Sequence, residues 1–419
     1  MHLNKDFQLA VVGGGASGFM GAIKAAEEGV TSVILLEAAG KTLEKVRISG
    51  GGRCNVTHAS WVPSDLIPNY PRGKLPLKAA FSRFATGDAV AWFEERGLEL
   101  VIEKDGRIFP KSNSSGEVIS CLHQSASRAG VICLKKKAVI DVEAIDKGRF
   151  ILRCKDGSCF YSNKVLLATG DNPIGKSIAS SLGHELVPSV PSIFSFKLSD
   201  QSLLNCAGIS VDSVKLTLNF EDQLFEEEGR ILITHKGISG PALLRLSAFA
   251  ARSLFNIKYK ALLRIAWVNN TNEYISDLLK QYRNDYPCQT LSRVHPFKFI
   301  PKRLWLHLLY KSDISNKLRW ANFSSFKERK LVEILRSDAL EIIGKGPFGE
   351  EFVTAGGVQL DEVNFKTMES NRCSGLYFAG EILDIDGVTG GFNFQHCWTS
   401  GWLAGKAIAN KLEEKHLID

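Results

Sequence analysis

The chain has 419 residues, of which 44% are apolar and 23% are charged, and its formal net charge is +7 at pH 7. This composition is typical of a globular protein and excludes a disordered chain or a fibrous array, while the length predicts two or three packed domains. The small positive surplus suits an anionic ligand or a nucleic acid, but it is more typical of an ordinary solvated surface.

The sequence indicates neither a membrane span nor a metal site. No stretch approaches the ~18 uninterrupted apolar residues of a membrane span, and an apolar strand begins within a few residues of Met1, where a signal peptide would lie. The nine cysteines are scattered without a CxxC pair, so we expect reduced thiols and no bound metal. Together these features predict a cytoplasmic protein.

The first part of the chain is predicted to be an α/β segment that opens with a βαβ unit. Apolar runs, helical spacing and a capping box at Ser114 and Glu117 define its elements. In chain order these are a strand over 8–12, a helix over 16–28, a strand over 32–36, a helix from 114 to about 129, and alternating runs over 131–168 that end in a buried strand over 165–168.

From about residue 188 the pattern becomes rich in strands, which suits a small β domain, and then in helices. The expected elements are strands over 193–198, 213–220, 230–234 and 259–267, a helix starting at Pro241, a helical segment over 272–336, strands over 339–343 and 351–354, and a strand, glycine-rich loop and long helix within 375–412. The plan that these elements suggest is a discontinuous dinucleotide-binding domain, residues 1–190 and 350–419, interrupted by an inserted cap.

The first candidate site is a GxGxxG motif formed by Gly13, Gly15 and Gly18, placed directly after a strand and at the mouth of a helix. There, missing side chains let backbone amides and the helix dipole meet a pyrophosphate. Glu37 ends the second strand, where a carboxylate accepts hydrogen bonds from both ribose hydroxyls. The alternative, a tight turn without a ligand, is disfavoured by the complete βαβ context.

A second GxGxxG at residues 344–349 contains Pro347 and precedes a strand-like run. Without a helix behind it, a phosphate would lack amide donors, so we predict a turn there and one dinucleotide site in the chain.

Three consecutive glycines, Gly50 to Gly52, lie beside Arg53 and Cys54 in the run KVRISGGGRCN. They let the backbone pass close to a flat or anionic ligand, and Arg53 suits a phosphate or the negative charge of a reduced flavin. Cys54 is a candidate nucleophile, although a lone cysteine is more often a buried packing residue.

The C-terminal run predicts a second half of the cofactor site. Gly380 and Glu381 follow a strand, so the carboxylate is placed to bind ribitol hydroxyls, and residues 390–393 (Gly-Gly-Phe-Asn) open a helix whose amides favour negative charge on a reduced ring. A buried strand-turn-helix without a ligand is the alternative. It is disfavoured because so many glycines in one connection cost folding entropy.

Two histidines are candidates for proton transfer. His235, in the run THKGISGP, is the first and His396 is the second, and for each a structural, hydrogen-bonded histidine is an equally good interpretation. The aromatic residues Trp305, Trp320 and Phe323 of the helical segment are predicted to be core residues and not a surface for stacking bases.

Several runs resemble one family over nearly the whole chain: KVRISGGGRCNVTH, the ATG of residues 168–170, THKGISGP, and the long segment from TAGGVQLDEV to FNFQHCWTSGWLAG. It is the YhiN/BaiN-like FAD-binding family, which includes proteins described as aminoacetone oxidases and 3-dehydro-bile-acid reductases. The resemblance is weakest between about 270 and 335.

The resemblance implies a Rossmann-like FAD-binding α/β domain interrupted by a β-barrel-like domain (191–270 and 337–349) and a helical insert (271–336). With the motifs above, it predicts the FAD-binding residues Gly13, Gly15, Ala16, Ser17, Gly18, Glu37, Lys45, Ser49, Gly51, Arg53, Cys54, Val139, Thr169, Gly170, Gly380, Glu381, Gly390, Gly391, Phe392 and Asn393. One departure is that Asp171-Asn172-Pro173 follows the ATG, where the family carries a second glycine and a longer loop.

The function expected from these features is hydride transfer between FAD and a small organic substrate, with NAD(P)H or oxygen as the electron partner. The alternative is an RNA-binding or tRNA-modifying flavoprotein, suggested by the basic and aromatic residues between Arg283 and Lys330, and it ranks lower. The substrate, the reaction direction and the oligomeric state stay open.

Overall fold

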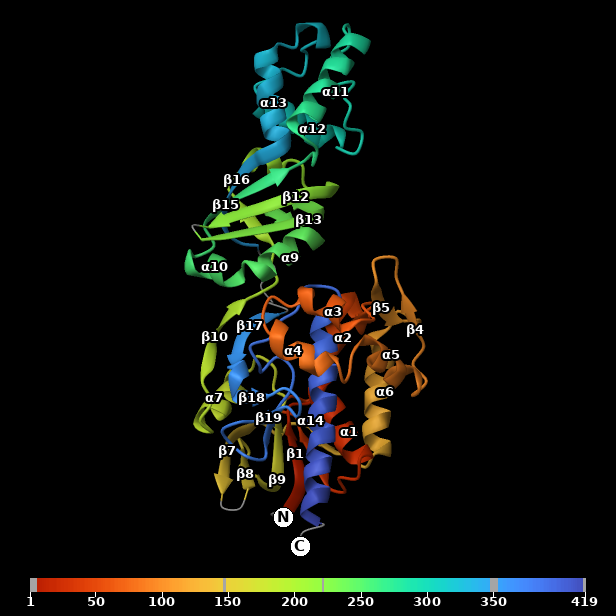
Figure 1. Cartoon of the computed structure of the whole chain (residues 1–419), viewed down its shortest axis with the longest axis vertical. Coiled ribbons are helices and arrows are strands. Elements are labelled where there is room, and N and C mark those ends of the chain that lie inside the picture. The colour runs from red at the N-terminus through yellow and green to blue at the C-terminus, as the bar shows by residue number, and fades with distance from the viewer. Residues whose placement is uncertain (1–5, 146–147, 221, 347–352, 417–419) are drawn as a thin grey trace. The chain divides into compact units, whose positions relative to one another are not determined.

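The computed structural model describes residues 6–145, 148–220, 222–346 and 353–416. The chain divides into two compact units, Met1–Ser189 with Thr354–Asp419, and Val190–Val353. Both units are shown in Figure 1. The strand expected over 351–354 and the end of the second GxGxxG lie partly outside the described residues, and the described part of that motif ends strand β16 without starting a helix.

A mixed sheet with parallel strands at its centre forms the middle of the first unit. Its central strands are almost entirely apolar because both faces of the sheet are covered. The strand order is β18 (Val363–Asn364), β19 (Glu369–Ser370), β20 (Leu376–Phe378), β9 (Cys159–Leu167), β1 (Asp6–Val12), β2 (Val33–Leu36) and β6 (Ile132–Leu134), and β8 (Arg149–Cys154) joins β7 (Val139–Ile145) to β9.

The register aligns the carboxyl ends of the central strands at one edge of the sheet. Val12 lies opposite Leu36 and Leu167, and Phe378 lies opposite Leu167. In open α/β sheets this edge is where ligands bind, because the loops that leave it converge there.

Helix α1 (Ala16–Glu27) and helix α14 (Phe392–His416) pack against each other on this sheet, as Figure 1 shows. Glycines allow their backbones to touch: a Cβ at Gly401 would lie 2.4 Å from the Ser17 carbonyl oxygen, and one at Gly405 would lie 2.5 Å from the Gly21 carbonyl oxygen. This close contact sets the position of the start of α14 relative to the start of α1.

The first unit contains further helices and strands. The helices are α2 (Glu44–Gly52), α3 (Pro63–Leu66), α4 (Lys74–Phe81), α5 (Thr86–Glu94), α6 (Ser115–Arg128) and α7 (Pro173–Ser181), and the strands are β3 (Thr57–His58), β5 (Arg107–Pro110) and β4 (Leu100–Ile102) in a small sheet and β10 (Leu186–Pro191) paired with β17 (Thr354–Val358). The Ser114 side chain caps α6 by accepting from the Gly116 amide.

The second unit combines a closed barrel with a helical part on a shared apolar core. The barrel order is β11 (Phe196–Leu198), β14 (Gly237–Ser239), β13 (Gln223–Thr234), β12 (Ser210–Phe220), β15 (Ala261–Ala266) and β16 (Asp338–Lys345), and its helices are α8 (Gln201–Leu204), α9 (Pro241–Phe249), α10 (Ala251–Asn256), α11 (Asn272–Asp285), α12 (Lys302–Lys311) and α13 (Ser325–Ser337).

The predicted fold class, a Rossmann-like domain interrupted by a barrel and a helical insert, is confirmed. The aromatics Trp305, Trp320 and Phe323 lie in the core, with 0%, 0% and 2% of their surface exposed. Strand β11 is shorter than the expected 193–198, because the Phe194 amide donates to the Ser247 hydroxyl instead of joining the ladder.

Candidate functional site

The turn between β1 and α1 forms an open cradle at a helix N-terminus. A Cβ at Gly13 would lie 2.4 Å from the Ala168 carbonyl oxygen, and one at Gly18 would lie 2.0 Å from the Gly13 carbonyl oxygen, so these two glycines serve close packing. A Cβ at Gly15 would meet nothing within 4 Å. Gly15 caps α1 without a side-chain hydrogen bond, which leaves the first amides of the helix available for an anion.

Glu37 leaves the end of β2 and reaches this turn. Its carboxylate accepts hydrogen bonds from the backbone amides of Gly14 at 2.8 Å and Ala39 at 2.7 Å. The Glu37 carbonyl also accepts from the Lys137 amide at 2.8 Å, which brings the chain just before Val139 beside this acid. The carboxylate is therefore placed next to the cradle, as recognition of a ribose requires.

The ends of β9 and β20 add a second group of predicted residues. A Cβ at Gly380 would lie 2.5 Å from the Ser17 hydroxyl oxygen, and one at Gly170 would lie 3.6 Å from a carboxylate oxygen of Glu381. Glu381 is buried and forms an ion pair of 2.5 Å with Lys45 from α2. These contacts join the four loops at the carboxyl edge of the sheet.

The pKa values of two lysines near Glu381 are shifted in opposite directions. Partial desolvation disfavours the charged form of Lys45, but attraction and hydrogen bonding to Glu381 raise its pKa overall. Lys176 is paired with Asp171 and with the Ser189 hydroxyl, and desolvation lowers its pKa against the attraction of Glu381. The loop that departs from the family pattern thus brings its own cation close to the predicted site.

The glycine run interrupts helix α2 with a left-handed loop. Gly50, Gly51 and Gly52 have φ angles of 56°, 69° and 87°, and a Cβ at Gly51 or Gly52 would meet nothing within 4 Å. Among the described residues, no partner reaches the buried side-chain oxygen of Asn55. An unpartnered buried oxygen costs about 1–3 kcal/mol, so this loop has the features of a ligand-binding segment. Ser49, at the same kink, donates from its hydroxyl to the Val46 carbonyl.

The Arg53 guanidinium already interacts with other side chains of the protein. Its guanidinium pairs with Glu103 at 2.7 Å and lies 4.0 Å from the centre of the Phe109 ring. This geometry argues against the expectation that Arg53 meets phosphate or flavin, since Glu103 already neutralises the cation.

Cys54 has the properties of a packing residue. It is 0% exposed, and burial, only partly offset by a hydrogen bond to Ser49, raises the pKa of its thiol to about 12. Because the thiolate is the nucleophile, the structure argues against the catalytic role considered from the sequence.

The loop before α14 is held by side chains of the predicted segment. Asn393 accepts from the Gly387 amide at 2.9 Å and donates to the Gly387 carbonyl at 2.8 Å. A Cβ at Gly391 would lie 2.6 Å from the Thr57 carbonyl oxygen, and the Phe392 ring stacks on His58 with centroids 4.8 Å apart. Gly390 and Gly391 have φ angles of 128° and 95°, so the helix starts from a turn that only glycine adopts easily.

His396 lies inside α14 with 2% of its surface exposed. Its Nε2 lies 3.3 Å from the Gly380 carbonyl oxygen, and burial lowers its pKa to about 4, so the ring is neutral near pH 7. Within the described chain, its Nδ1 is buried without a partner. Both facts favour a neutral hydrogen-bonding group near the β20 loop over a proton-transfer catalyst.

His235 lies in the second unit, whereas the residues above belong to the first unit. It is exposed in the two-residue turn between β13 and β14, where Thr234 pairs with Gly237. Its catalytic role stays a prediction.

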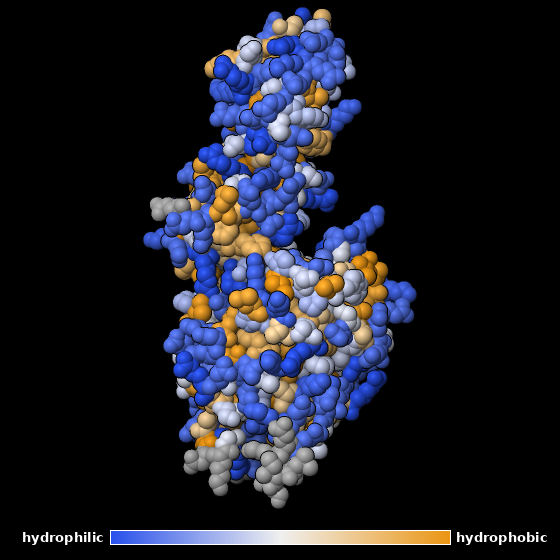
Figure 2. Space-filling model, in the orientation of Figure 1, coloured by the Kyte–Doolittle hydropathy of each residue, from blue (hydrophilic) through white to orange (hydrophobic). Residues whose placement is uncertain are grey.

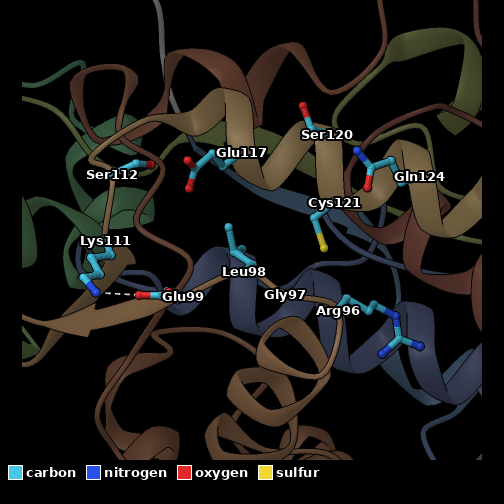
Figure 3. A pocket seen from close by; sticks show the side chains of 10 residues that line it. All are labelled: Arg96, Gly97, Leu98, Glu99, Lys111, Ser112, Glu117, Ser120, Cys121 and Gln124. Atoms are coloured by element: carbon cyan, nitrogen blue, oxygen red, sulfur yellow. Dashed lines mark hydrogen bonds and ion pairs between the residues drawn. The ribbon is translucent and has the colours of Figure 1, made fainter.

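A surface pocket of about 480 Å³ lies elsewhere in the first unit, between α5, α6 and the chain around β4 and β5, as Figure 3 shows. It contains the exposed ion pair of Glu99 and Lys111, 2.6 Å apart, and none of the predicted residues. The space for a dinucleotide is instead the open edge described above. Over the residues that the structure describes, three or more His, Cys, Asp or Glu side chains nowhere gather as metal ligands would, and no helix combines the length and apolarity of a membrane span.

Sequence reasoning missed three residues of this edge. The Gly14 amide donates a hydrogen bond to the Glu37 carboxylate. Asn55 carries the unpartnered buried oxygen, and Lys176 lies near Glu381. Asn55 belongs to the recognised glycine-rich run, so its position next to three glycines was an available signal. Lys176 had none, because its pairing with Asp171 and Ser189 depends on how the loop folds.

The described residues fit FAD. An open cradle at a helix start, the carboxylate of Glu37 at the second strand, a second acid at Glu381 and two unpartnered buried polar atoms lie at one edge of the sheet. This fold and site define a flavoprotein oxidoreductase of the Rossmann type.

The family described as the HI0933-like protein Rossmann domain matches residues 7–407, and the chain belongs to it. The resemblance to YhiN/BaiN-like proteins is thereby confirmed. The chain is 29% identical to 3-dehydro-bile acid delta(4,6)-reductase of Clostridium scindens, over 96% of this chain and 99% of that protein. It is 28% identical to the ribosomal RNA dihydrouridine synthase of Escherichia coli, over 96% and 98%.

Solved structures share the fold. The 3-ketosteroid-delta4-(5alpha)-dehydrogenase of Rhodococcus jostii is 13% identical with a TM-score of 0.51, covering 97% of each chain. The 3-ketosteroid delta1-dehydrogenase of Sterolibacterium denitrificans is 12% identical with a TM-score of 0.51, covering 97% of this chain and 100% of that one.

Proposed function

We propose that this FAD-dependent oxidoreductase reduces a carbon–carbon double bond that is conjugated to a carbonyl group. The observation that carries the proposal is the open cradle at Gly15 beside Glu37, which suits the dinucleotide part of FAD. The chemistry is supported by the names of two relatives, since a delta(4,6)-reductase of a 3-dehydro-bile acid and a dihydrouridine synthase both describe saturation of a C=C bond next to a carbonyl.

Different residues at this edge of the sheet would bind different parts of FAD. The amides at the start of α1 would hold the pyrophosphate, Glu37 the ribose hydroxyls and Glu381 the ribitol hydroxyls. The first amides of α14 would stabilise negative charge at the ring. When bound, the flavin supplies a hydride from its N5.

In the proposed reaction the hydride goes to the carbon β to the carbonyl and a proton goes to the α carbon, so one π bond breaks and two C–H bonds form. NAD(P)H is the proposed source of the two electrons. His235 is the proposed proton donor, because its side chain is exposed and histidine is the most frequent general acid in enzymes. Burial of Cys54 and His396 leaves them without access to solvent protons.

The primary candidate substrate is a small conjugated enone. A second candidate is a uracil base in RNA, favoured by the composition of the helical insert. Residues 271–336 contain 13 Lys and Arg against 6 Asp and Glu, and one relative acts on ribosomal RNA by its name.

The test uses purified holoprotein without oxygen. Denaturation should release FAD and not FMN, because the cradle and Glu37 serve an adenosine half that FMN lacks. NADH or NADPH should bleach the flavin absorbance, and a 3-oxo-Δ4 steroid or a uridine-containing RNA should restore it with formation of the saturated product. Release of FMN, or a reduced flavin that neither substrate reoxidises under these conditions, would contradict the proposal.

A further inference from the structure

The positive charge of the chain is concentrated in one part of the fold. The 13 basic and 6 acidic residues of 271–336 leave 39 basic and 39 acidic residues for the rest, so the helical insert accounts for the whole net charge of +7. Charge segregated in this way creates a local positive field that a uniformly solvated surface lacks.

Four of the 13 basic residues of the insert lie in the two linkers between its helices. Linker A, residues 286–301, joins α11 to α12, and linker B, residues 312–324, joins α12 to α13. The stretch 286–312 contains five basic residues and no acid. The exposed basic side chains of the two linkers are Arg293 and Lys298 in linker A, and Lys317 and Arg319 in linker B.

The linkers are bound to each other along their length. The Leu291 amide donates to the Leu318 carbonyl at 3.1 Å, the Trp320 amide donates to the Gln289 carbonyl at 2.9 Å, and the Ser292 hydroxyl donates to the Asn316 carbonyl at 2.5 Å. Arg293 and Lys317 directly follow the last two of these residues in sequence. The pairing therefore brings basic side chains of both linkers onto one surface, which we call the linker surface.

Core tryptophans make this surface rigid. The Trp305 indole N–H donates to the Leu291 carbonyl at 2.7 Å, and the Trp320 indole N–H donates to the Val294 carbonyl at 3.0 Å. Both rings are 0% exposed. An ordered surface loses little entropy on binding, which favours a specific interaction.

Three lysines on the helices of the insert are paired with acidic residues. Lys280, Lys311 and Lys330 form ion pairs with Asp277, Asp338 and Asp313. Within the part of the chain that the structure describes, Arg293, Lys298, Lys317 and Arg319 have no acidic partner. Their charges are available to an external anion.

Exposed aromatic rings lie on linker A beside these charges. Tyr286 is 41% exposed and Phe299 is 54% exposed. The face of the helical part that Figure 2 shows is mostly hydrophilic, with separate apolar side chains. Basic side chains interspersed with exposed rings are the pattern that single-stranded nucleic acids recognise.

We propose that the linker surface binds the phosphodiester backbone of single-stranded RNA, with Arg293, Lys317 and Arg319 as phosphate contacts. An anionic membrane would favour a basic amphipathic helix over paired irregular linkers. The inference rests on the second form of the proposed function, in which a base in RNA is the substrate.

The test measures binding of a fluorescein-labelled, uridine-containing single-stranded RNA to holoprotein by anisotropy, from about 50 mM to about 200 mM KCl. The triple variant Arg293→Gln, Lys317→Gln, Arg319→Gln is compared with a control, Lys104→Gln, Arg128→Gln, Lys155→Gln. The control removes equal charge from exposed residues of the first unit that lie outside the proposed cofactor site.

The wild-type protein should lose affinity steeply with salt, and the linker variant should bind at least ~10-fold more weakly with a salt slope reduced by about 2, as expected for three lost contacts to a single strand. The control should stay within about twofold of wild type. Equal losses in both variants, no binding by wild type at low salt, or stronger binding to phosphatidylserine vesicles than to RNA would overturn the inference. Flavin absorbance and thermal melting verify that each variant is folded.

The same preparations separate this inference from the proposed function. Salt-sensitive RNA binding by a protein whose reduced flavin reduces no substrate would leave the surface in place and reject the reductase. Reduction of a small enone by a protein that binds no RNA would support the reductase and reject the RNA-binding surface.

Discussion

Gly15→Val is expected to remove FAD while leaving the fold intact. Gly15 has φ −90° and ψ −171°, an extended conformation that valine adopts, and a Cβ there meets nothing within 4 Å. The free energy of unfolding of the apoprotein should therefore change by no more than ~0.5 kcal/mol. The space that the valine methyl groups enter is the one we assign to the pyrophosphate.

Two free-energy costs determine how much FAD affinity the Gly15→Val variant loses. Overpacking against the phosphates costs about 1–3 kcal/mol, and moving them from the helix N-terminus costs up to ~2 kcal/mol. At 1.4 kcal/mol per factor of ten, FAD affinity should fall by ~10²-fold or more. Isothermal titration of apoprotein with FAD measures the affinity, and thermal melting followed by circular dichroism measures the stability.

Gly18→Val is the matched control, because it places the same side chain three residues further along the motif. Its Cβ would lie 2.0 Å from the Gly13 carbonyl oxygen, so it should destabilise the protein itself. A Gly15→Val protein that melts like wild type and still binds stoichiometric FAD would refute the placement of the pyrophosphate.

Three further predictions concern single residues. Cys54→Ser should leave flavin reduction unchanged, and the Cys54 thiol should react with a disulfide reagent only after unfolding, because burial raises its pKa to about 12; rapid labelling of the native thiol would contradict this. His235→Asn should keep the flavin spectrum but slow the chemical step by ~100-fold or more, and normal turnover with reduced stability would instead make this residue structural. For His396 the folded pKa of about 4 lies below the ordinary 6.5, so the unfolded state binds more protons between these values and the free energy of unfolding should fall as pH drops from 6.5 to 4. Denaturant titrations across this range should show a smaller fall for His396→Asn, and an equal fall in both proteins would count against the buried neutral ring.

The sequence was sufficient for the fold class and for the first half of the site. Gly13, Gly15, Gly18 and Glu37 lie within one βαβ unit, and their roles depend on local geometry that the spacing of the residues determines. The burial of Trp305 in α12 also followed from helical periodicity, since apolar residues on one face of a helix must pack together. Trp320 is buried as expected, but it lies in the linker between α12 and α13 and not on a long helix.

The tertiary structure decided which polar residues have partners and which are exposed. Arg53 was assigned to the cofactor from its neighbours in sequence, but Glu103, fifty residues away, holds its guanidinium. For Cys54 the sequence already made a packing residue the more common case, and its complete burial in the structure supports that interpretation. Likewise, the linkers pair between Ser292 and Asn316, and no local pattern predicts that contact. The physical reason is that desolvation and charge pairing depend on atoms that distant segments contribute, whereas helix, strand and turn formation depend mainly on residues within a few positions.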